Sequence, residues 1–365
     1  MFFICLCSHL SLSLNTDKYG FMSNSFNYIL LTTLLCLFSC VADRKPGNAF
    51  APDLLGEAAE EIRYSQFVNS LEYIPLETTD ECLIGKITDI ALTDDRIFVL
   101  DELQQTVWVF TSDGRYINRI GKRGEGPGEY LRITQLEYDK TKNQLIVLSS
   151  SKLFFYDATN GEYIKTIELD READDFKLCP DGGFILSNMG EAVSSAGVYR
   201  TDAEGNTLES LVTRSPEHLV RTTTRWELCS YGNTLCFMAP NFKNDVYHYD
   251  GQHLTCQYAF QMKPELKRTY RESVSLQHLD DFMRTLYLEG EKWIYAVYWS
   301  AKEDIRVLLF SKEEGKYRVG RKMVNDLDKI KAGKWTSSTE GNRFVTCQNA
   351  DDPEKNPVVG ILYLK

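Results

Sequence analysis

The feature of the sequence that most constrains its fold is a strand–turn–strand pattern that recurs about every 45 residues. In each copy, a run of alternating apolar residues leads into a polar turn with a glycine, and a second alternating run follows. The turn glycines are Gly114, Gly161, Gly205, Gly251 and Gly315. Because glycine readily adopts the positive φ that tight hairpin turns require, each copy predicts a β-hairpin.

A further apolar run precedes each hairpin, and a sixth such run lies near the end of the chain. These runs are 96–101, 144–149, 183–188, 234–239, 293–299 and 343–348. A short strand and a polar turn are predicted before each of them. Four strands per period of about 45 residues is typical of a β-propeller blade. We therefore predict an all-β fold, a six-bladed β-propeller with four-stranded antiparallel blades, as a single domain over 64–365.

The sixth copy of the pattern is incomplete, because the chain ends at Lys365 after its third strand. The segment 70–77, SLEYIPLE, is a predicted strand without a partner before the first blade. Pairing the two would close the ring and remove the exposed sheet edges that invite aggregation. We therefore expect the last blade to be closed by an N-terminal strand.

The interval between the last two turn glycines is longer than the others. The excess coincides with 263–287, which lacks strand alternation. Leu279, Phe282, Met283 and Leu286 follow helical spacing there. A helical or loop insertion at about 263–287 would restore the period.

The first 45 residues differ from the rest of the chain. The run 28–40, YILLTTLLCLFSC, is apolar and about 13 residues long, which suits the core of a signal peptide better than a membrane-spanning helix. It ends in a sequence that resembles a bacterial lipobox, so we expect lipidation at Cys40 and anchoring at the cell envelope. Met22 is a plausible true start, with 1–21 lying upstream of it. A plain cleaved signal or a short anchor is the alternative, and either membrane face is open.

Six cysteines follow the leader: Cys82, Cys179, Cys229, Cys236, Cys256 and Cys347. None forms a CxxC pair, and no histidine has zinc-finger spacing. We expect buried free thiols. Cys229 and Cys236 flank the turn at 231–233, so a disulfide across this hairpin is the pairing to test.

Three stretches together carry a family resemblance. They are IPLETTDECLIGKITDI (74–90), RIFVLD (96–101) and FTSDGRYINRIGKRGEGPGEY (110–130). They resemble the six-bladed β-propeller lipoproteins of Bacteroides and relatives, which are similar in pattern to NHL-repeat propellers. The resemblance extends over about 64–365 and implies the fold. It implies little about chemistry, because one fold serves many functions.

The glycine-rich stretch 119–133 contains Lys122 and Arg123. Successive backbone N–H groups with nearby cations can form an anion site. The stretch is not a Walker motif, because its lysine precedes the glycines. The preferred interpretation is a connection from the outermost strand of one blade to the innermost strand of the next.

A second candidate ligand site is Arg221, Arg225 and Trp226, between the third and fourth blades. An aromatic ring beside arginines suits a sugar or an anionic ligand. Pairing of these arginines with surface acids is the structural alternative.

A metal site is a further alternative. Some six-bladed enzymes hold a divalent ion in the central channel with acids from inner strands, and the candidates here are Asp89, Glu137, Asp175 and Glu227. These acids share no clear blade position in the sequence. The histidines are scattered, and neither an HExxH motif nor a GxSxG motif occurs.

The formal net charge of −11 argues against nucleic-acid binding, which requires a basic face. The leading hypothesis is a non-catalytic binding or scaffold protein for an envelope glycan, peptide or protein, expected to be monomeric, to need no cofactor and to contact the membrane only through its lipid anchor. The alternative is a metal-dependent hydrolase or lyase of the lactonase-like propeller type, with calcium or zinc in the channel.

Overall fold

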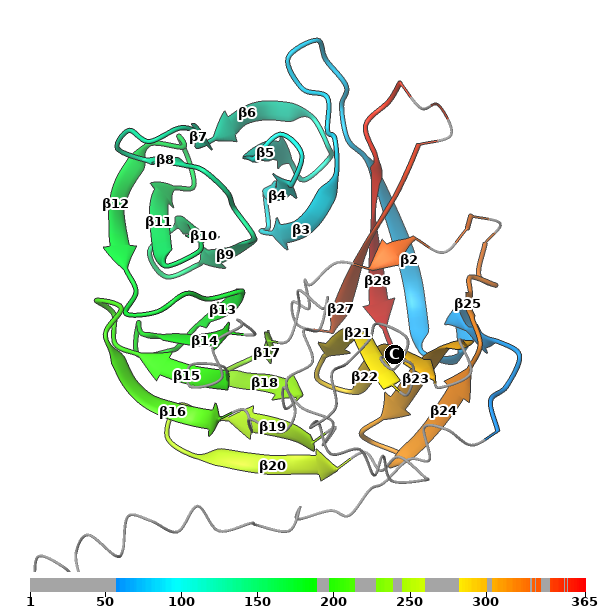
Figure 1. Cartoon of the computed structure of the whole chain (residues 1–365). Helices are drawn as coiled ribbons and strands as arrows, with labels where there is room; N and C mark the ends of the chain where they lie inside the picture. The colour runs from blue at the N-terminus through cyan, green and yellow to red at the C-terminus, as the bar shows by residue number, and fades with distance from the viewer. Residues whose placement is uncertain are drawn as a thin grey trace, which may run out of the picture. The chain divides into compact units, whose positions relative to one another are not determined.

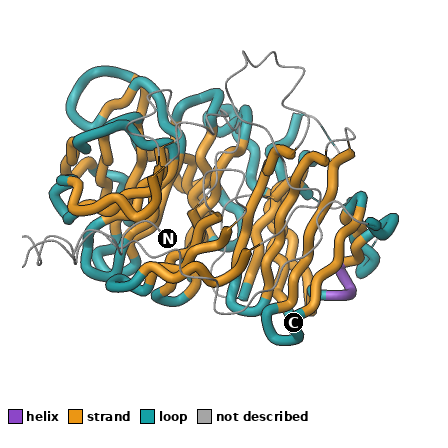
Figure 2. The backbone as a smooth tube through the Cα atoms, turned by 60° about the horizontal axis from the view of Figure 1, so that its bottom comes forward, coloured by secondary structure: helices purple, strands orange, loops and turns teal. Residues whose placement is uncertain are grey.

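The computed structural model describes residues 57–188, 197–213, 228–238, 245–259, 282–300, 304–328, 330–331, 333–335, 342–350, 352 and 354–365. The chain divides after Lys45, and these residues lie in the second unit, Pro46–Lys365. Figure 2 shows that strands and their turns account for nearly all of them. The helical element is a single 3-10 turn, η1 (Tyr64–Gln66). Within the described ranges, no helix is long and apolar enough to cross a membrane.

The described strands form six four-stranded antiparallel sheets in a propeller arrangement (Figure 1), which confirms the predicted fold. The first three blades contain β3 (Ile87–Leu92), β4 (Arg96–Asp101), β5 (Thr106–Thr111) and β6 (Tyr116–Ile120); β9 (Gln135–Asp139), β10 (Gln144–Ser149), β11 (Lys152–Asp157) and β12 (Tyr163–Glu168); and β13 (Asp175–Leu178), β14 (Phe184–Asn188), β15 (Gly197–Thr201) and β16 (Thr207–Thr213). The next two contain β17 (Leu228–Tyr231), β18 (Thr234–Met238), β19 (Asp245–Tyr249) and β20 (Leu254–Ala259); and β21 (Phe282–Glu289), β22 (Trp293–Ser300), β23 (Asp304–Ser311) and β24 (Lys316–Gly320).

The sixth blade combines the two ends of this unit. Its strands are β26 (Lys334–Trp335), β27 (Arg343–Gln348), β28 (Val358–Leu364) and β2 (Val68–Pro75), in that order across the sheet. The blue β2 runs antiparallel to the red β28 in Figure 1, with Ile74 opposite Val359. The predicted closure by an N-terminal strand is therefore confirmed.

Six hydrophobic clusters among the described residues hold the blades together. Each cluster takes its side chains from two consecutive blades. Val109 of the first blade shares a cluster with Leu145 of the second. The last cluster packs Ile361 of the sixth blade with Trp108 of the first. Because this cluster links the last blade back to the first, burial of apolar surface continues around the whole ring.

The turns between the third and fourth strands of the first five blades contain the predicted glycines. All five have positive φ, from 63° at Gly315 to 97° at Gly251. At Gly114, an added Cβ would lie only 2.2 Å from the carbonyl oxygen of Pro75. The hairpins inferred from these glycines are therefore confirmed.

The expectation of helical spacing at the end of the predicted insertion was wrong. Residues 282–287 belong to β21, which pairs with β22, whereas 263–281 lie outside the described residues. The register between these strands shifts between Arg284 and Leu286. Such an irregularity interrupts the two-residue alternation of a strand, so the apolar residues resemble a helical pattern.

The glycine-rich connection joins β6, the outermost strand of the first blade, to β9, the innermost strand of the second, as predicted. It contains two short strands that pair in parallel, β7 (Lys122–Arg123) and β8 (Glu129–Tyr130). Gly121 has a φ of 68°, and an added Cβ there would lie 2.5 Å from the Tyr130 hydroxyl. A second parallel pair joins β1 (Ile62–Arg63), which directly precedes η1, to β25 (Met323–Val324), which follows β24.

Candidate functional site

Two of the predicted metal ligands occupy equivalent positions on the inner strands of the first and third blades. Asp89 lies opposite Leu100, and Asp175 lies opposite Ser187 in the same register of its own blade. The expectation that these acids share no blade position was therefore wrong for this pair. A register shift between Ile87 and Asp89 hides the equivalence in the sequence.

Both aspartates use their carboxylates to connect consecutive blades. Asp89 Oδ2 accepts a hydrogen bond of 3.2 Å from the N–H of Leu136 in the second blade. Asp175 Oδ2 accepts one of 3.0 Å from the N–H of Leu228 in the fourth blade. The side-chain amide of Gln135 donates to Asp175 Oδ1 at 3.1 Å. These contacts are inter-blade hydrogen bonds, and they fix the inner strands relative to one another.

Glu137, a third predicted ligand, pairs with Lys177 at the equivalent position of the next blade. Lys177 Nζ lies 2.6 Å from Glu137 Oε2, and both side chains are largely buried. Burial alone would lower the pKa of Lys177, but the carboxylates of Glu137, Asp89 and Asp175 outweigh burial and raise it. The inner strands of the first three blades thus place three carboxylates around the single ammonium of Lys177. Glu227, the fourth predicted ligand, lies outside the described residues.

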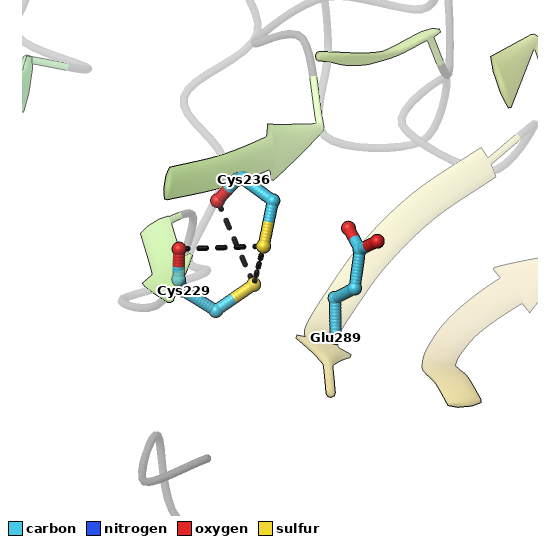
Figure 3. Close-up of side chains that lie close together, drawn as sticks. All are labelled: Cys229, Cys236 and Glu289. Carbon is cyan, nitrogen blue, oxygen red and sulfur yellow. Dashed lines mark hydrogen bonds between the residues drawn. The ribbon is translucent and has the colours of Figure 1, made fainter. Parts of the chain in front are cut away.

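A different group of side chains lies between the fourth and fifth blades (Figure 3). Cys229 of β17 and Cys236 of β18 are directly opposite one another in the sheet and are buried free thiols. Their Sγ atoms lie 3.1 Å apart. Each sulfur also lies near the carbonyl oxygen of the other cysteine. The structure therefore brings together the pair that the sequence singled out, as thiols without a disulfide.

Glu289, the last residue of β21, faces these thiols and has no exposed side-chain surface. His248 Nε2 lies 2.8 Å from its Oε1 atom, and the Tyr287 hydroxyl donates to its Oε2 atom. Lys312 Nζ contacts Oε1 at 2.5 Å. Burial by itself disfavours the charged carboxylate, but the His248 hydrogen bond and the Lys312 ammonium outweigh it and hold the pKa of Glu289 below its ordinary value.

The thiols and the carboxylate form a compact donor group. One ligand atom from each of Cys229, Cys236 and Glu289 lies within 4.8 Å of the others. Among the described residues, these three side chains are the one set of acids, cysteines and histidines whose ligand atoms lie close enough together to share a metal ion. Burial, together with the neighbouring Cys229, raises the pKa of Cys236 well above its ordinary value. We call Cys229, Cys236, Glu289, His248 and Lys312 the inter-blade cluster.

The sequence identified two of the five residues of the inter-blade cluster, the cysteine pair. His248 was one of the scattered histidines, to which no motif gave a role. Glu289 and Lys312 carried no recognisable motif, because they belong to another blade. The one available signal was an acid at the end of the otherwise apolar run LYLE at 286–289.

The predicted ligand-binding residues have different outcomes. Lys122 and Arg123 are exposed on β7, and Lys122 Nζ lies 2.7 Å from Glu129 Oε1. Arg221, Arg225 and Trp226 lie outside the described residues, as does the predicted lipidation site Cys40. The ligand-binding roles of all five therefore stay predictions.

Three leucines are strongly exposed on connections at one end of the ring, and we call them the leucine surface. Leu83 is 52% exposed, Leu103 is 70% exposed and Leu131 is 59% exposed. Leu83 precedes β3, Leu103 lies between β4 and β5, and Leu131 precedes β9. Because β4 is antiparallel to β3, all three connections lie at the end of the blades where the inner strands begin. The Gln104 side chain donates to the Leu83 carbonyl at 3.0 Å, and Gln105 Oε1 accepts from the N–H of Ile133 at 2.7 Å. Hydrogen bonds therefore hold these connections together.

Comparison with solved structures supports the propeller fold. A crystal structure of a Bacteroides fragilis protein that is inferred to be exported aligns with a TM-score of 0.69 at 16% identity, over 84% of this chain and 100% of that one. A member of the DUF4221 family from Bacteroides vulgatus aligns with a TM-score of 0.48 at 11% identity, over 82% of this chain and 97% of that one. At 16% identity, the likeness to the Bacteroides fragilis protein shows the fold alone.

None of the curated proteins matches the chain. A family described as a domain of unknown function, DUF4934, matches residues 53–357, which include nearly the whole propeller. The chain therefore belongs to the DUF4934 family.

Proposed function

We propose that this protein is a non-catalytic binding protein of the cell envelope that captures a protein or peptide partner on the leucine surface. The observation that carries the proposal is the exposure of Leu83, Leu103 and Leu131 together at one end of the ring. Apolar side chains that remain exposed as a group favour contact with another apolar surface. The hydrogen bonds between these connections present the three leucines on a preformed surface, which lowers the entropic cost of binding.

The chemistry of this surface indicates the kind of partner. Leucine side chains offer neither an aromatic face nor polar groups to a sugar ring, so they favour apolar protein side chains over a glycan. Arg123 and Arg132 are exposed near the leucines, and neither has an ion pair with another described residue. In a chain of net charge −11, these cations favour a partner segment that is both apolar and acidic.

The inner-strand acids support a binding role more than a metal-dependent reaction. Asp89 and Asp175 direct carboxylate oxygens at backbone N–H groups of the next blade, and Glu137 pairs with Lys177. Through these contacts each of the three acids connects its blade to the next. A channel metal would have to displace or share them.

The location at the envelope is part of the proposal. The apolar run 28–40 and its ending at Cys40 support export and lipid attachment. The exported character inferred for the Bacteroides fragilis protein of the same fold agrees with this location.

A site-specific photocrosslinker tests the leucine surface. We expect a crosslinker at position 103 to capture an envelope protein, whereas one at position 208 does not. Leu208 is a matched control, since it is 53% exposed but lies on β16, the outermost strand of the third blade. Leu131→Asp should reduce capture at position 103 because it adds a charge to the apolar contact. Equal capture at both positions, or capture that Leu131→Asp leaves unchanged, would contradict the proposal.

The same crosslinking experiment in the presence of a chelator separates the binding role from the enzymatic alternative. We expect capture at position 103 to survive metal removal, since the leucine surface needs no ion. Loss of capture on chelation, restored by added calcium or zinc, would favour the metal-dependent alternative.

A further inference from the structure

We propose that Cys229, Cys236 and Glu289 bind a zinc ion that joins the fourth blade to the fifth. The donor atoms are two sulfurs and a carboxylate oxygen within 4.8 Å of one another, all from fully buried side chains. Zinc binds thiolate, imidazole and carboxylate groups, usually in tetrahedral geometry. Magnesium and calcium prefer all-oxygen sites, so the sulfur content selects a zinc-like ion.

The backbone places His248 in the same cross-strand row as the two cysteines. Cys229 is opposite Cys236 in the sheet, and Cys236 is opposite His248 on the next strand. Residues directly opposite on neighbouring strands project from the same face of a sheet. His248 Nε2 lies 2.8 Å from Glu289 Oε1, so the imidazole is positioned to orient the carboxylate rather than to bind the ion itself.

The distance between the two sulfurs lies between that of a zinc site and that of a disulfide, so a small opening would admit an ion. With Zn–S bonds of about 2.3 Å, two sulfurs of a tetrahedral site lie about 3.8 Å apart. The observed separation is 3.1 Å, so binding requires an opening of about 0.7 Å. A disulfide requires the sulfurs to approach to about 2.05 Å, a closure of about 1 Å.

The charges of the inter-blade cluster also balance with zinc present. Without metal, the Lys312 ammonium compensates the Glu289 carboxylate, and both cysteines are free thiols. On binding, Zn²⁺ replaces the two thiol protons, which leave to solvent. Two thiolates, one carboxylate, one ammonium and Zn²⁺ then sum to zero. Lys312 can therefore remain in place, and the buried site gains no net charge.

Cobalt(II) provides the direct test, because thiolate ligation gives a charge-transfer absorption in the near ultraviolet. We expect the reduced full-length protein, purified in detergent, to bind about one equivalent of cobalt with this absorption, and zinc to displace it. Cys229→Ser and Cys236→Ser should abolish the absorption. Cys179→Ser should retain it, since Cys179 is equally buried but belongs to the core between the third and fourth blades. His248→Ala should weaken cobalt affinity about 10- to 100-fold.

A measurement on the unsubstituted protein keeps the test valid if a serine variant does not fold. At a denaturant concentration at which the buried cores open transiently, we expect zinc to slow the alkylation of Cys229 and Cys236, whereas the half-buried Cys256 reacts at an unchanged rate. Absence of the cobalt absorption in the reduced protein, or equal alkylation with and without zinc, would overturn the proposal. So would a Cys229–Cys236 disulfide, seen as the loss of two hydrogens by mass, in protein taken directly from the envelope. None of these results bears on the leucine surface.

Discussion

Asp175 accepts a hydrogen bond from the backbone N–H of Leu228 across the boundary between the third and fourth blades. The same carboxylate accepts bonds from the Gln135 side chain and from the N–H of Phe176. One side chain thereby contacts the inner strands of three consecutive blades. Asp89 makes the corresponding contact from the first blade to the second. Together these aspartates explain why buried acids occur on strands that otherwise pack apolar side chains.

Asp175→Ala should destabilise the ring. The substitution leaves the Leu228 N–H and the Gln135 amide without this acceptor, and each buried donor so affected costs about 1–3 kcal/mol. We expect a lower melting temperature by circular dichroism. Asp94→Ala, in the exposed turn between β3 and β4, is the control and should have little effect. Equal melting temperatures for the two variants would contradict the inter-blade role.

Closure of the sixth blade by β2 gives a second prediction. Ile74 is 7% exposed and packs in the cluster that joins the sixth blade to the first. Ile74→Ala should reduce the free energy of unfolding by about 2–5 kcal/mol, because it leaves a cavity in this cluster. Ser70→Ala on the exposed face of the same strand should change it little. Denaturant titration of the two variants measures the difference.

Deletion of 70–77 is the stronger form of this test. It removes most of β2 and exposes the edge of β28, so we expect loss of the cooperative thermal transition. An unchanged melting temperature would show that the ring does not depend on this strand.

The sequence carried enough information for the fold because its signals are local. Short apolar runs marked β4 and β10 at their observed bounds, and glycines marked the hairpin turns. The apolar pattern did not reveal β21, because the register shift between Arg284 and Leu286 disrupts the alternation of its side chains. A strand with such a shift shows neither a clean two-residue period nor a true helical one.

The candidate site was much less predictable, because it depends on contacts between blades. His248 and Glu289 are 41 residues apart in the chain and meet only when the fourth and fifth blades pack. The equivalence of Asp89 and Asp175 was likewise hidden by a register shift at the start of β3. Pattern analysis identifies which residues belong to a strand, but the register between strands decides which polar groups come together.

The proposed lipid anchor gives a third prediction. Metabolic labelling with a tagged fatty acid should label the full-length protein and fail on Cys40→Ala, because lipidation requires that thiol. Cys36→Ala lies in the same apolar run and should keep the label. Equal labelling of the two variants would rule out Cys40 as the modified residue.

The buried carboxylate of Glu289 predicts a specific dependence of stability on pH. The pKa of Glu289 is held below its ordinary value of 4.5 in the folded state, despite burial, by His248 and Lys312. A lowered folded-state pKa stabilises the protein at pH values above the unfolded-state pKa, and this contribution is lost as pH falls through the folded-state pKa. Glu289→Gln lacks the contribution at every pH. The melting temperature of the wild-type protein should therefore be higher than that of Glu289→Gln, and this gap should be largest at about pH 7. The gap should narrow as the pH falls below about 4.5.

Thermal melts over this pH range, with a chelator present to remove any bound ion, measure the gap. Glu291→Gln, at an exposed position in the next turn, should track the wild-type protein at all pH values. A gap between wild type and Glu289→Gln that stays constant or widens on acidification would mean that the folded-state pKa is not lowered. In that case His248 and Lys312 do not stabilise the charged form of Glu289, and the charge balance that accommodates zinc in the inter-blade cluster would fail with it.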